Sequence, residues 1–301
     1  MSRGKRAGMQ KPNVFILGAP KCGTTSLADW LAEHPQVYFS PIKEPYFFNY
    51  DYGFRRPWRL ERYERLFEGA GESHRAVCEA STRYLYSRTA VPAILAYADA
   101  PKFIVMLRNP VRMAPSLHEQ AVFSGAEDEE DFVRAWRLQR ERLYYASVPK
   151  HCRDPQVLQY GTLCKLGEQL ERLYRQVPRE QVHVIHLEDM QADPRGEYRR
   201  LLDFLGLDDD GRETFPVANQ AKARRLPWLM HGVQRTNELI KALGVPPLRV
   251  GLTAFLYAKL RKTRPRAPLS AETTRMLEEY FAEDLRLLEK LGHAPRQVSG
   301  H

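Results

Sequence analysis

The stretch from Val14 to Leu31, VFILGAPKCGTTSLADWL, decides the expected fold. Its first four residues are apolar and have the length and composition of a buried parallel strand. Gly18 and Pro20 end that run, and a helical pattern with one apolar face follows. A strand, a tight loop and a helix in this order aim the loop amides and the first free N–H groups of the helix at one point. The stretch therefore predicts an anion-binding site.

The loop, Lys21-Cys22-Gly23-Thr24-Thr25-Ser26, carries the residue types that such a site needs. Its glycine lets the backbone approach a ligand, its hydroxyl groups donate hydrogen bonds, and its lysine adds a mobile positive charge. A nucleoside-triphosphate loop has its lysine after the second glycine, whereas here Lys21 precedes Gly23. A plain turn with capping threonines would explain the hydroxyl groups but not the lysine, so we favour the anion site.

The chain has 301 residues, of which 43% are hydrophobic and 28% charged, which is a globular composition with length for a full core. A formal net charge of +9 and a pI near 9.4 suit a polyanionic ligand, without choosing among nucleotide, acidic glycan, nucleic acid and membrane surface. No apolar run is long enough to span a membrane. Residues 1–12 are basic and lack an apolar segment, which predicts a disordered arm rather than a secretory signal.

The cysteines follow no regular spacing, which is typical of reduced thiols in a cytoplasmic protein. They are Cys22, Cys78, Cys152 and Cys164. A zinc site built from His151, Cys152 and Cys164 would have poor ligand spacing, so we predict no metal.

Apolar runs and helical patterns alternate from residue 13 to residue 206. We expect strands at 14–17, 37–39, 76–79, 102–107 and 182–187, and helices at 58–69, 89–98, 128–147, 161–174, 195–205 and 271–291. This alternation predicts a P-loop-like three-layer α/β/α fold with a central parallel sheet, followed by extra C-terminal helices.

Glu44 lies in a segment that suits a catalytic base. It stands between Pro41 and Pro45 and is followed by three aromatic residues, Tyr46-Phe47-Phe48. Two prolines and an apolar neighbourhood can hold a carboxylate rigidly enough to accept a proton from a substrate. A surface ion pair explains the spacing equally well.

A second cationic group follows the strand expected at 102–107. The strand ends in Arg108-Asn109-Pro110-Val111-Arg112, whereas nucleotide-hydrolysing proteins usually end it in an aspartate that holds Mg²⁺. Ligands of open parallel sheets bind at the carboxyl edge, where Arg108 would lie. A cation there suits a phosphate group better than a metal ion.

Other charged segments have structural interpretations. The acidic run Glu127–Asp131 is expected to cap the helix at 128–147, which buries Phe132, Ala135, Trp136 and Leu143, although a role in orienting an acceptor stays open. His183 and His186 are expected to be core or edge residues, because no third ligand is spaced to join them.

The region after residue 218 has weaker signals. Its basic residues, Lys222, Arg224 and Arg225, form either a surface charge run or a loop over a bound polyanion. The apolar segment 252–260 is expected to be a docking helix or acceptor-site lid rather than a membrane-surface helix.

Taken in order, these motifs resemble those of sulfotransferases that use 3′-phosphoadenosine-5′-phosphosulfate (PAPS), in particular the branch with bacterial and glycosaminoglycan enzymes. The resemblance covers about residues 13–225. It implies that residues Lys21–Ser26 bind the 5′-phosphosulfate, that Arg108 and Ser116 bind the 3′-phosphate, and that Glu44 is the base. Lys222, Arg224 and Arg225 lie where the family has a basic loop over the nucleotide.

The resemblance also implies an activity and a domain plan. The chain would move a sulfonate group from PAPS, without a metal, to a hydroxyl or amine of a carbohydrate or small metabolite. Residues 13–301 would form one domain, with a PAPS-binding core at 13–225 and C-terminal helices at 226–301. Neither the acceptor nor the oligomeric state can be predicted.

Two departures stand out. Glycosaminoglycan enzymes often carry a catalytic lysine where this chain has Glu79-Ala80-Ser81, and the late basic loop lacks a clear Lys-Gly pair. The histidine base of the steroid and phenol branch has no obvious counterpart, and His118 is expected to be structural.

Two other functions compete with sulfonate transfer. One is a Mg²⁺-dependent nucleotide kinase or NTPase, in which the segment Val184–Asp189 would hold the metal. The other is a basic protein that binds a polyanion, although no motif here is typical of nucleic-acid recognition.

Overall fold

The structure is a computed structural model that describes residues 10–52, 58–218, 222–224, 261–263, 268–294 and 296. It divides into two compact units, residues 1–218 with 270–301, and residues 219–269. In the second unit, β6 (Lys222–Arg224) pairs antiparallel with β7 (Arg261–Thr263). The expected basic loop therefore contains a short strand, while Arg225 and the segment 252–260 lie outside the described residues.

The first unit is built on a sheet of five parallel strands in the order β2-β3-β1-β4-β5. The strands are β1 (Val14–Gly18), β2 (Val37–Phe39), β3 (Ala76–Ala80), β4 (Lys102–Leu107) and β5 (Val182–His186). All five residues of the central strand β1 are buried, because both faces of the sheet are covered. The predicted strands are confirmed.

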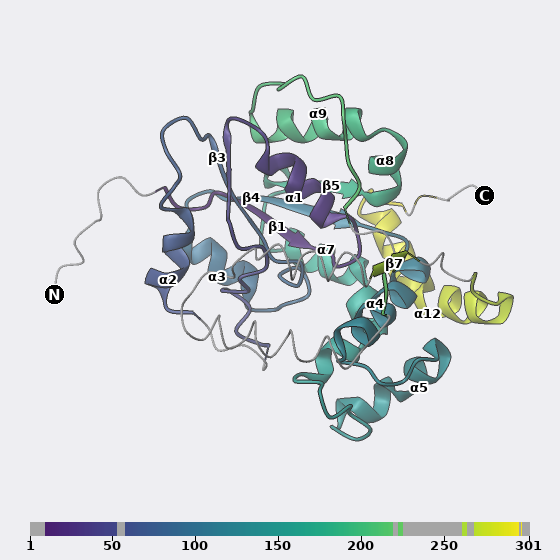
Figure 1. Ribbon diagram of the computed structural model, residues 1–301. Helices are drawn as coiled ribbons and strands as arrows, with labels where there is room; N and C mark the ends of the chain where they lie inside the picture. Colours follow the sequence, from purple (N-terminus) through teal and green to yellow (C-terminus); the bar gives the residue numbers. More distant parts are fainter. Residues whose placement is uncertain are drawn as a thin grey trace. The chain divides into compact units, whose positions relative to one another are not determined.

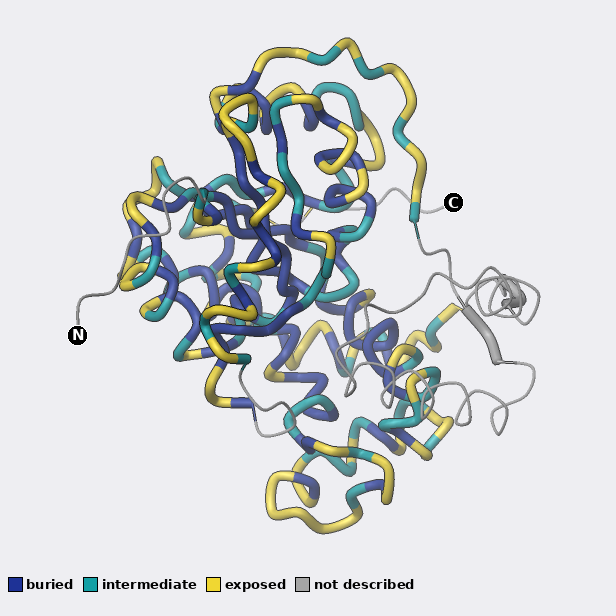
Figure 2. Tube along the Cα trace, turned by 60° about the vertical axis from the view of Figure 1, so that its left-hand side comes forward, coloured by how far each residue is buried: buried dark blue, intermediate teal, exposed yellow. Residues whose placement is uncertain are grey.

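Helices cover both faces of this sheet. Figure 1 shows α1 (Thr24–Ala32), α8 (Leu187–Ala192) and α9 (Pro194–Leu205) on one face, with α3 (Ala90–Tyr97) and α7 (Leu166–Tyr174) on the other. The remaining helices are α2 (Leu60–Glu64), α4 (Pro110–Ser124), α5 (Phe132–Leu143), α6 (Tyr160–Cys164) and α12 (Ala271–Lys290), with 3₁₀ turns at Arg65–Phe67, Pro155–Leu158 and Arg179–Gln181. The buried segments of the first unit run through its centre (Figure 2). The three-layer α/β/α prediction is confirmed, and α12 is the member of the predicted C-terminal helices that lies within the described residues.

Residues 10–12, which we assigned to a disordered arm, instead contact this unit. Pro12 is buried, and Lys11 Nζ donates to Tyr97 O at 3.1 Å and lies 4.6 Å from the centre of the Tyr97 ring. None of the helices within the described ranges is long and apolar enough to cross a membrane.

Two expected helices are interrupted. The helix expected at 161–174 is divided at Lys165 into α6 and α7, and the helix expected at 58–69 is α2 followed by a 3₁₀ turn. Asp284 of α12 explains the first break, because its carboxylate accepts from the backbone N–H groups of Gly167 and Glu168 at 3.0 and 2.9 Å. These amides have no partner within a helix that begins at Leu166. Residues far along the chain thus decide where α7 begins.

The acidic run before α5 was only partly predicted. Asp131 caps the helix as expected, since its Oδ1 accepts from Arg134 N at 2.8 Å, but the helix covers 132–143 rather than 128–147. Leu143, expected to be buried, is 59% exposed. Glu127 does not cap the helix, because its side chain is fully buried and pairs with Arg142.

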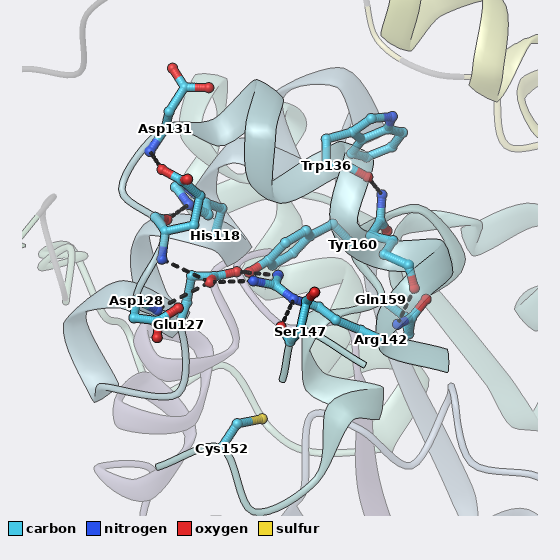
Figure 3. Close-up of polar contacts among 12 residues, drawn as sticks. His118, Glu127, Asp128, Asp131, Trp136, Arg142, Ser147, Cys152, Gln159 and Tyr160 are labelled. Carbon is cyan, nitrogen blue, oxygen red and sulfur yellow. Dashed lines mark hydrogen bonds and ion pairs between the residues drawn. The ribbon is translucent and has the colours of Figure 1, made fainter. Parts of the chain in front are cut away.

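Glu127 is the centre of a buried polar cluster (Figure 3). Its carboxylate accepts from Arg142 Nη1 at 2.5 Å, Arg142 Nη2 at 2.7 Å and Tyr160 OH at 2.8 Å. Burial would raise the pKa of Glu127, but the Arg142 guanidinium, the Glu129 amide and the Tyr160 hydroxyl together hold it below its usual value. His118, expected to be structural, lies beside the cluster, with Nε2 2.7 Å from Glu129 O.

Replacing Arg142 with methionine is expected to lower the free energy of unfolding by about 3–5 kcal/mol at pH 8, because the Glu127 charge would be left buried and unpaired. The loss should shrink as the pH falls, since the unpaired carboxyl would then take up a proton. Urea unfolding at several pH values measures both effects. On the same helix, Arg134→Met removes a pair whose arginine is 69% exposed and should cost about 1 kcal/mol or less. Equal losses in the two variants would contradict the prediction.

Candidate active site

Three neighbouring strands, β3, β1 and β4, end at the same edge of the sheet. The loop after β1 is tied to β4 by a hydrogen bond from Ala19 N to Met106 O at 2.9 Å. Arg108, the first residue after β4, donates from Nη1 to Lys21 O at 3.0 Å. The two segments that the sequence singled out for anion binding therefore meet at one point.

The loop before α1 combines a left-handed glycine with a helix end that lacks negative charge. Gly23, the N-cap of α1, has φ 86°, and a Cβ there would come within 2.8 Å of Leu187 and 2.9 Å of Met190 in α8. The first turn of α1 contains no acidic residue, and its N-cap, Gly23, has no side chain that could cap the helix. The amide groups and the dipole at this helix end therefore suit an anion.

The side chains of the loop differ in their access to a ligand. Lys21 and Thr25 are half-buried, whereas Thr24 and Ser26 are buried, and Ser26 Oγ accepts from Ala218 N at 3.0 Å. Ser26, predicted to bind the donor, is thus engaged in supporting a neighbouring segment. Cys22 is fully buried, and this burial raises the pKa of its thiol to about 12, so only its backbone suits an anion.

Arg108 leads directly into α4, which carries the second predicted phosphate ligand. Asn109 Oδ1 accepts from Val111 N at 3.0 Å and so caps α4, and Pro110 takes the first helical position. The Arg108 side chain is half-buried at the sheet edge, whereas Ser116 is 3% exposed within the helix. Arg108 is therefore the more accessible of the two.

Glu44 is held at the end of β3. Its backbone is left-handed, with φ 60°, and its N–H donates to Ala80 O at 2.8 Å. Thr82 Oγ1 donates to Glu44 Oε1 at 2.8 Å. Because β3 lies next to β1, the half-buried Glu44 carboxylate belongs to the same sheet edge as the loop before α1.

A buried carboxyl group, Glu79, supports the segment that carries Glu44. Glu79 accepts from Ser81 Oγ at 2.6 Å, from Tyr63 OH at 2.7 Å and from Tyr84 OH at 3.4 Å. Ser81 Oγ in turn accepts from Tyr46 N at 3.1 Å, and Tyr84 OH from the next two amides. In the sequence, Glu79 stood out only as part of a segment in which related enzymes often carry a lysine. The supporting role of Glu79 could have been suspected, because a carboxyl group in a buried strand needs hydrogen-bond partners.

Burial raises the pKa of Glu79 to about 7, although its three hydroxyl donors oppose the shift. The folded protein then keeps this proton to a higher pH than the unfolded chain, so wild-type stability should fall as the pH rises from 4.5 to about 7. Glu79→Gln should remove up to about 3 kcal/mol of this decline. Urea unfolding of both proteins at pH 5 and pH 8 tests this, and parallel declines would contradict it.

The other predicted ligands lie in the second unit or outside the described residues. Lys222 and Arg224 are in β6, and Arg225 is not described. Their place over a bound nucleotide stays a prediction. A contact that sequence reasoning missed is that of Lys43, whose Nζ donates to Thr25 Oγ1 in the first turn of α1 at 2.9 Å.

Comparisons with known proteins identify the family. The family model described as the sulfotransferase domain matches residues 11–222. The chain therefore belongs to the sulfotransferase family, as its motifs predicted.

Particular relatives are similar to parts or all of the chain. Heparan sulfate glucosamine 3-O-sulfotransferase 3A1 of Mus musculus is 31% identical over 198 residues, which are 66% of this chain and 46% of the relative. Carbohydrate sulfotransferase 15 of Rattus norvegicus is 39% identical over 79 residues, covering 23% of this chain and 14% of that protein. The chain thus spans about half the length of the first of these relatives and a smaller share of the second. A crystal structure of a sulfotransferase from Alicyclobacillus acidocaldarius superposes with a TM-score of 0.71 at 26% identity, covering 96% of this chain and 98% of that one.

Proposed function

We propose that this protein transfers a sulfonate group from PAPS to a hydroxyl group of a carbohydrate. Family membership supports the reaction class, and the names of the heparan sulfate and carbohydrate sulfotransferases support the acceptor class. The observation that carries the proposal is the hydrogen bond from Arg108 Nη1 to Lys21 O, because it joins the two predicted phosphate-binding segments at one sheet edge.

Each end of the donor would have its own group of ligands. The 5′-phosphosulfate would bind the amides at the N-terminus of α1, with the Lys21 ammonium beside it and Thr25 as a hydroxyl donor. The 3′-phosphate would bind the Arg108 guanidinium, whose planar N–H groups match phosphate oxygens. Ser116 and the basic residues 222, 224 and 225 are further proposed ligands of the nucleotide.

In the transfer step, the acceptor oxygen attacks the sulfur atom as the bond from sulfur to the bridging phosphate oxygen breaks. The electron pair of that bond stays on the phosphate of the leaving adenosine 3′,5′-bisphosphate. The acceptor proton passes to the Glu44 carboxylate, which Thr82 holds at the sheet edge. Lys21 and the loop amides would stabilise the charge that develops on the leaving oxygen.

The kinase alternative needs a metal-binding carboxylate after β5. The segment Val184–Asp189 ends in two carboxylates. Asp189 accepts from Arg296 Nε at 3.0 and 2.9 Å, and Glu188 Oε1 accepts from Asn109 N at 3.4 Å. These contacts give both carboxylates other partners and do not favour a metal site. We therefore propose no second function.

Calorimetric titration of the wild type with adenosine 3′,5′-bisphosphate, 5′-AMP and ATP with Mg²⁺ tests the donor site. The proposal predicts that adenosine 3′,5′-bisphosphate binds tightly and that the other two nucleotides bind weakly. Labelled PAPS, incubated with oligosaccharides from heparosan and from heparan sulfate or with a small phenol, tests the acceptor. Preference for ATP with Mg²⁺ would overturn the donor assignment, whereas transfer to the phenol alone would overturn the carbohydrate assignment.

A further inference from the structure

Lys43 and Glu44 are adjacent in the chain, but their side chains reach different elements. Lys43 Nζ donates to Thr25 Oγ1 in α1 at 2.9 Å, whereas the Glu44 carboxylate accepts from Thr82 after β3. The left-handed backbone of Glu44 turns the chain at this point. Lys43 therefore contacts the start of α1, while Glu44, the proposed base, contacts the segment after β3.

The surroundings of Lys43 are unfavourable for a purely structural ammonium group. The side chain is half-buried, and the hydrogen-bond acceptor that the described residues offer its Nζ is a neutral hydroxyl. Burial lowers the pKa of Lys43, and the charges of Glu44 and Asp29 oppose that shift. Burying this charge costs free energy that an uncharged side chain would avoid, and the charges of Glu44 and Asp29 offset only part of that cost. An ammonium group has three N–H donors, and the bond to Thr25 Oγ1 uses one of them.

We infer that Lys43 is a further catalytic residue, whose ammonium group binds the phosphosulfate of the donor beside Thr25. The inference rests on the proposed function. As the bond from sulfur to the bridging oxygen breaks, that oxygen keeps the electron pair, and Lys43 donates a hydrogen bond to the growing charge without losing its proton. The segment Glu79-Ala80-Ser81 at the end of β3 contains no lysine, so Lys43 supplies positive charge from a different segment.

A structural strut is the competing role, since the same bond ties the Glu44 segment to α1. The two roles predict different kinetic effects when the charge of Lys43 is removed or made permanent. Lys43→Met removes the charge at similar length, and Lys43→Arg keeps a guanidinium that stays charged at high pH. Lys165→Met is the matched control, because Lys165 forms an ion pair on the surface with Glu168.

The experiment combines two measurements on these variants. Calorimetry with adenosine 3′,5′-bisphosphate reports donor-site binding without the sulfonate. Single-turnover cleavage of labelled PAPS, with heparan sulfate oligosaccharide or water as acceptor, reports the chemical step. Lys43→Met should cleave saturating PAPS about 10–100-fold more slowly, with thermal stability close to that of the wild type. It should also weaken bisphosphate binding, because the oxygen that keeps the electron pair remains on the 5′-phosphate. The wild-type rate should fall at alkaline pH as Lys43 loses its proton, and Lys43→Arg should lack this fall.

Each other result counts against the inference. Wild-type cleavage rates in Lys43→Met would overturn it. A structural role is indicated instead if Lys43→Met loses bisphosphate binding, thermal stability and rate together, while the rate of Lys43→Arg still falls at alkaline pH. That result would also overturn the inference. These results would leave the proposed function intact if the wild type still cleaves PAPS. A wild type that neither binds the bisphosphate nor cleaves PAPS would overturn both.

Discussion

Glu44→Gln should reduce the rate of sulfonate transfer at saturating PAPS by roughly 10²-fold or more, because the amide cannot accept the acceptor proton. Glutamine has nearly the same shape and can still accept from Thr82 Oγ1, which is 2.8 Å from Glu44 Oε1 in the wild type. Affinity for adenosine 3′,5′-bisphosphate should therefore stay within about two-fold of the wild type, since the change removes no donor ligand. Single-turnover kinetics and calorimetry measure the two quantities.

The matched control for this variant is Glu61→Gln, an exposed carboxylate in the first turn of α2. It should leave both the rate and the affinity unchanged. If Glu44→Gln transfers sulfonate at the wild-type rate, Glu44 is not the base. If it loses donor affinity and rate together, the carboxylate has a structural role instead.

Arg108→Ala should weaken binding of adenosine 3′,5′-bisphosphate by about 10–100-fold, because a charged hydrogen bond to the 3′-phosphate is lost. Affinity for 5′-AMP, which lacks that phosphate, should change much less. The discriminating quantity is therefore the ratio of the two affinities, measured by calorimetry. An equal loss for both nucleotides would indicate that Arg108 acts mainly through its bond to Lys21 O, by shaping the loop.

Arg112→Ala provides the control within the same segment. Its side chain is exposed, four residues after Arg108 at the start of α4, and the variant carries the same change in net charge. It should leave the ratio of bisphosphate to 5′-AMP affinity within about two-fold of the wild type, because a solvated charge contributes little through space. A collapse of the ratio in both variants would assign the discrimination to general positive charge.

The strands and the loop before α1 could be predicted because their signals are local. A buried parallel strand is a short apolar run, and the loop before α1 carries its glycine, lysine and hydroxyl residues within six positions. The approach of Arg108 to Lys21 was also predictable, since neighbouring parallel strands end at the same edge. The bond between them, across 87 positions of the chain, required the register of β1 and β4.

Other parts of the site and fold depend on partners that are distant in the chain. Glu127 was expected to cap a helix, but Arg142 and Tyr160, 15 and 33 positions away, draw it into the interior. Lys43 was passed over because nothing near it in the sequence points to Thr25, 18 positions earlier. Neither pairing has a periodic signal that sequence analysis could detect.

The sequence by itself determined the layered α/β fold, the loop between β1 and α1 and the family, because apolar periodicity and closely spaced motifs are properties of short segments. The tertiary structure decided which side chains share an environment. It placed Glu79 under the Glu44 segment, paired Glu127 with Arg142, and set Lys43 against Thr25. The physical reason is that burial and hydrogen-bond partners, which govern the charge of a side chain, arise only when distant segments pack together.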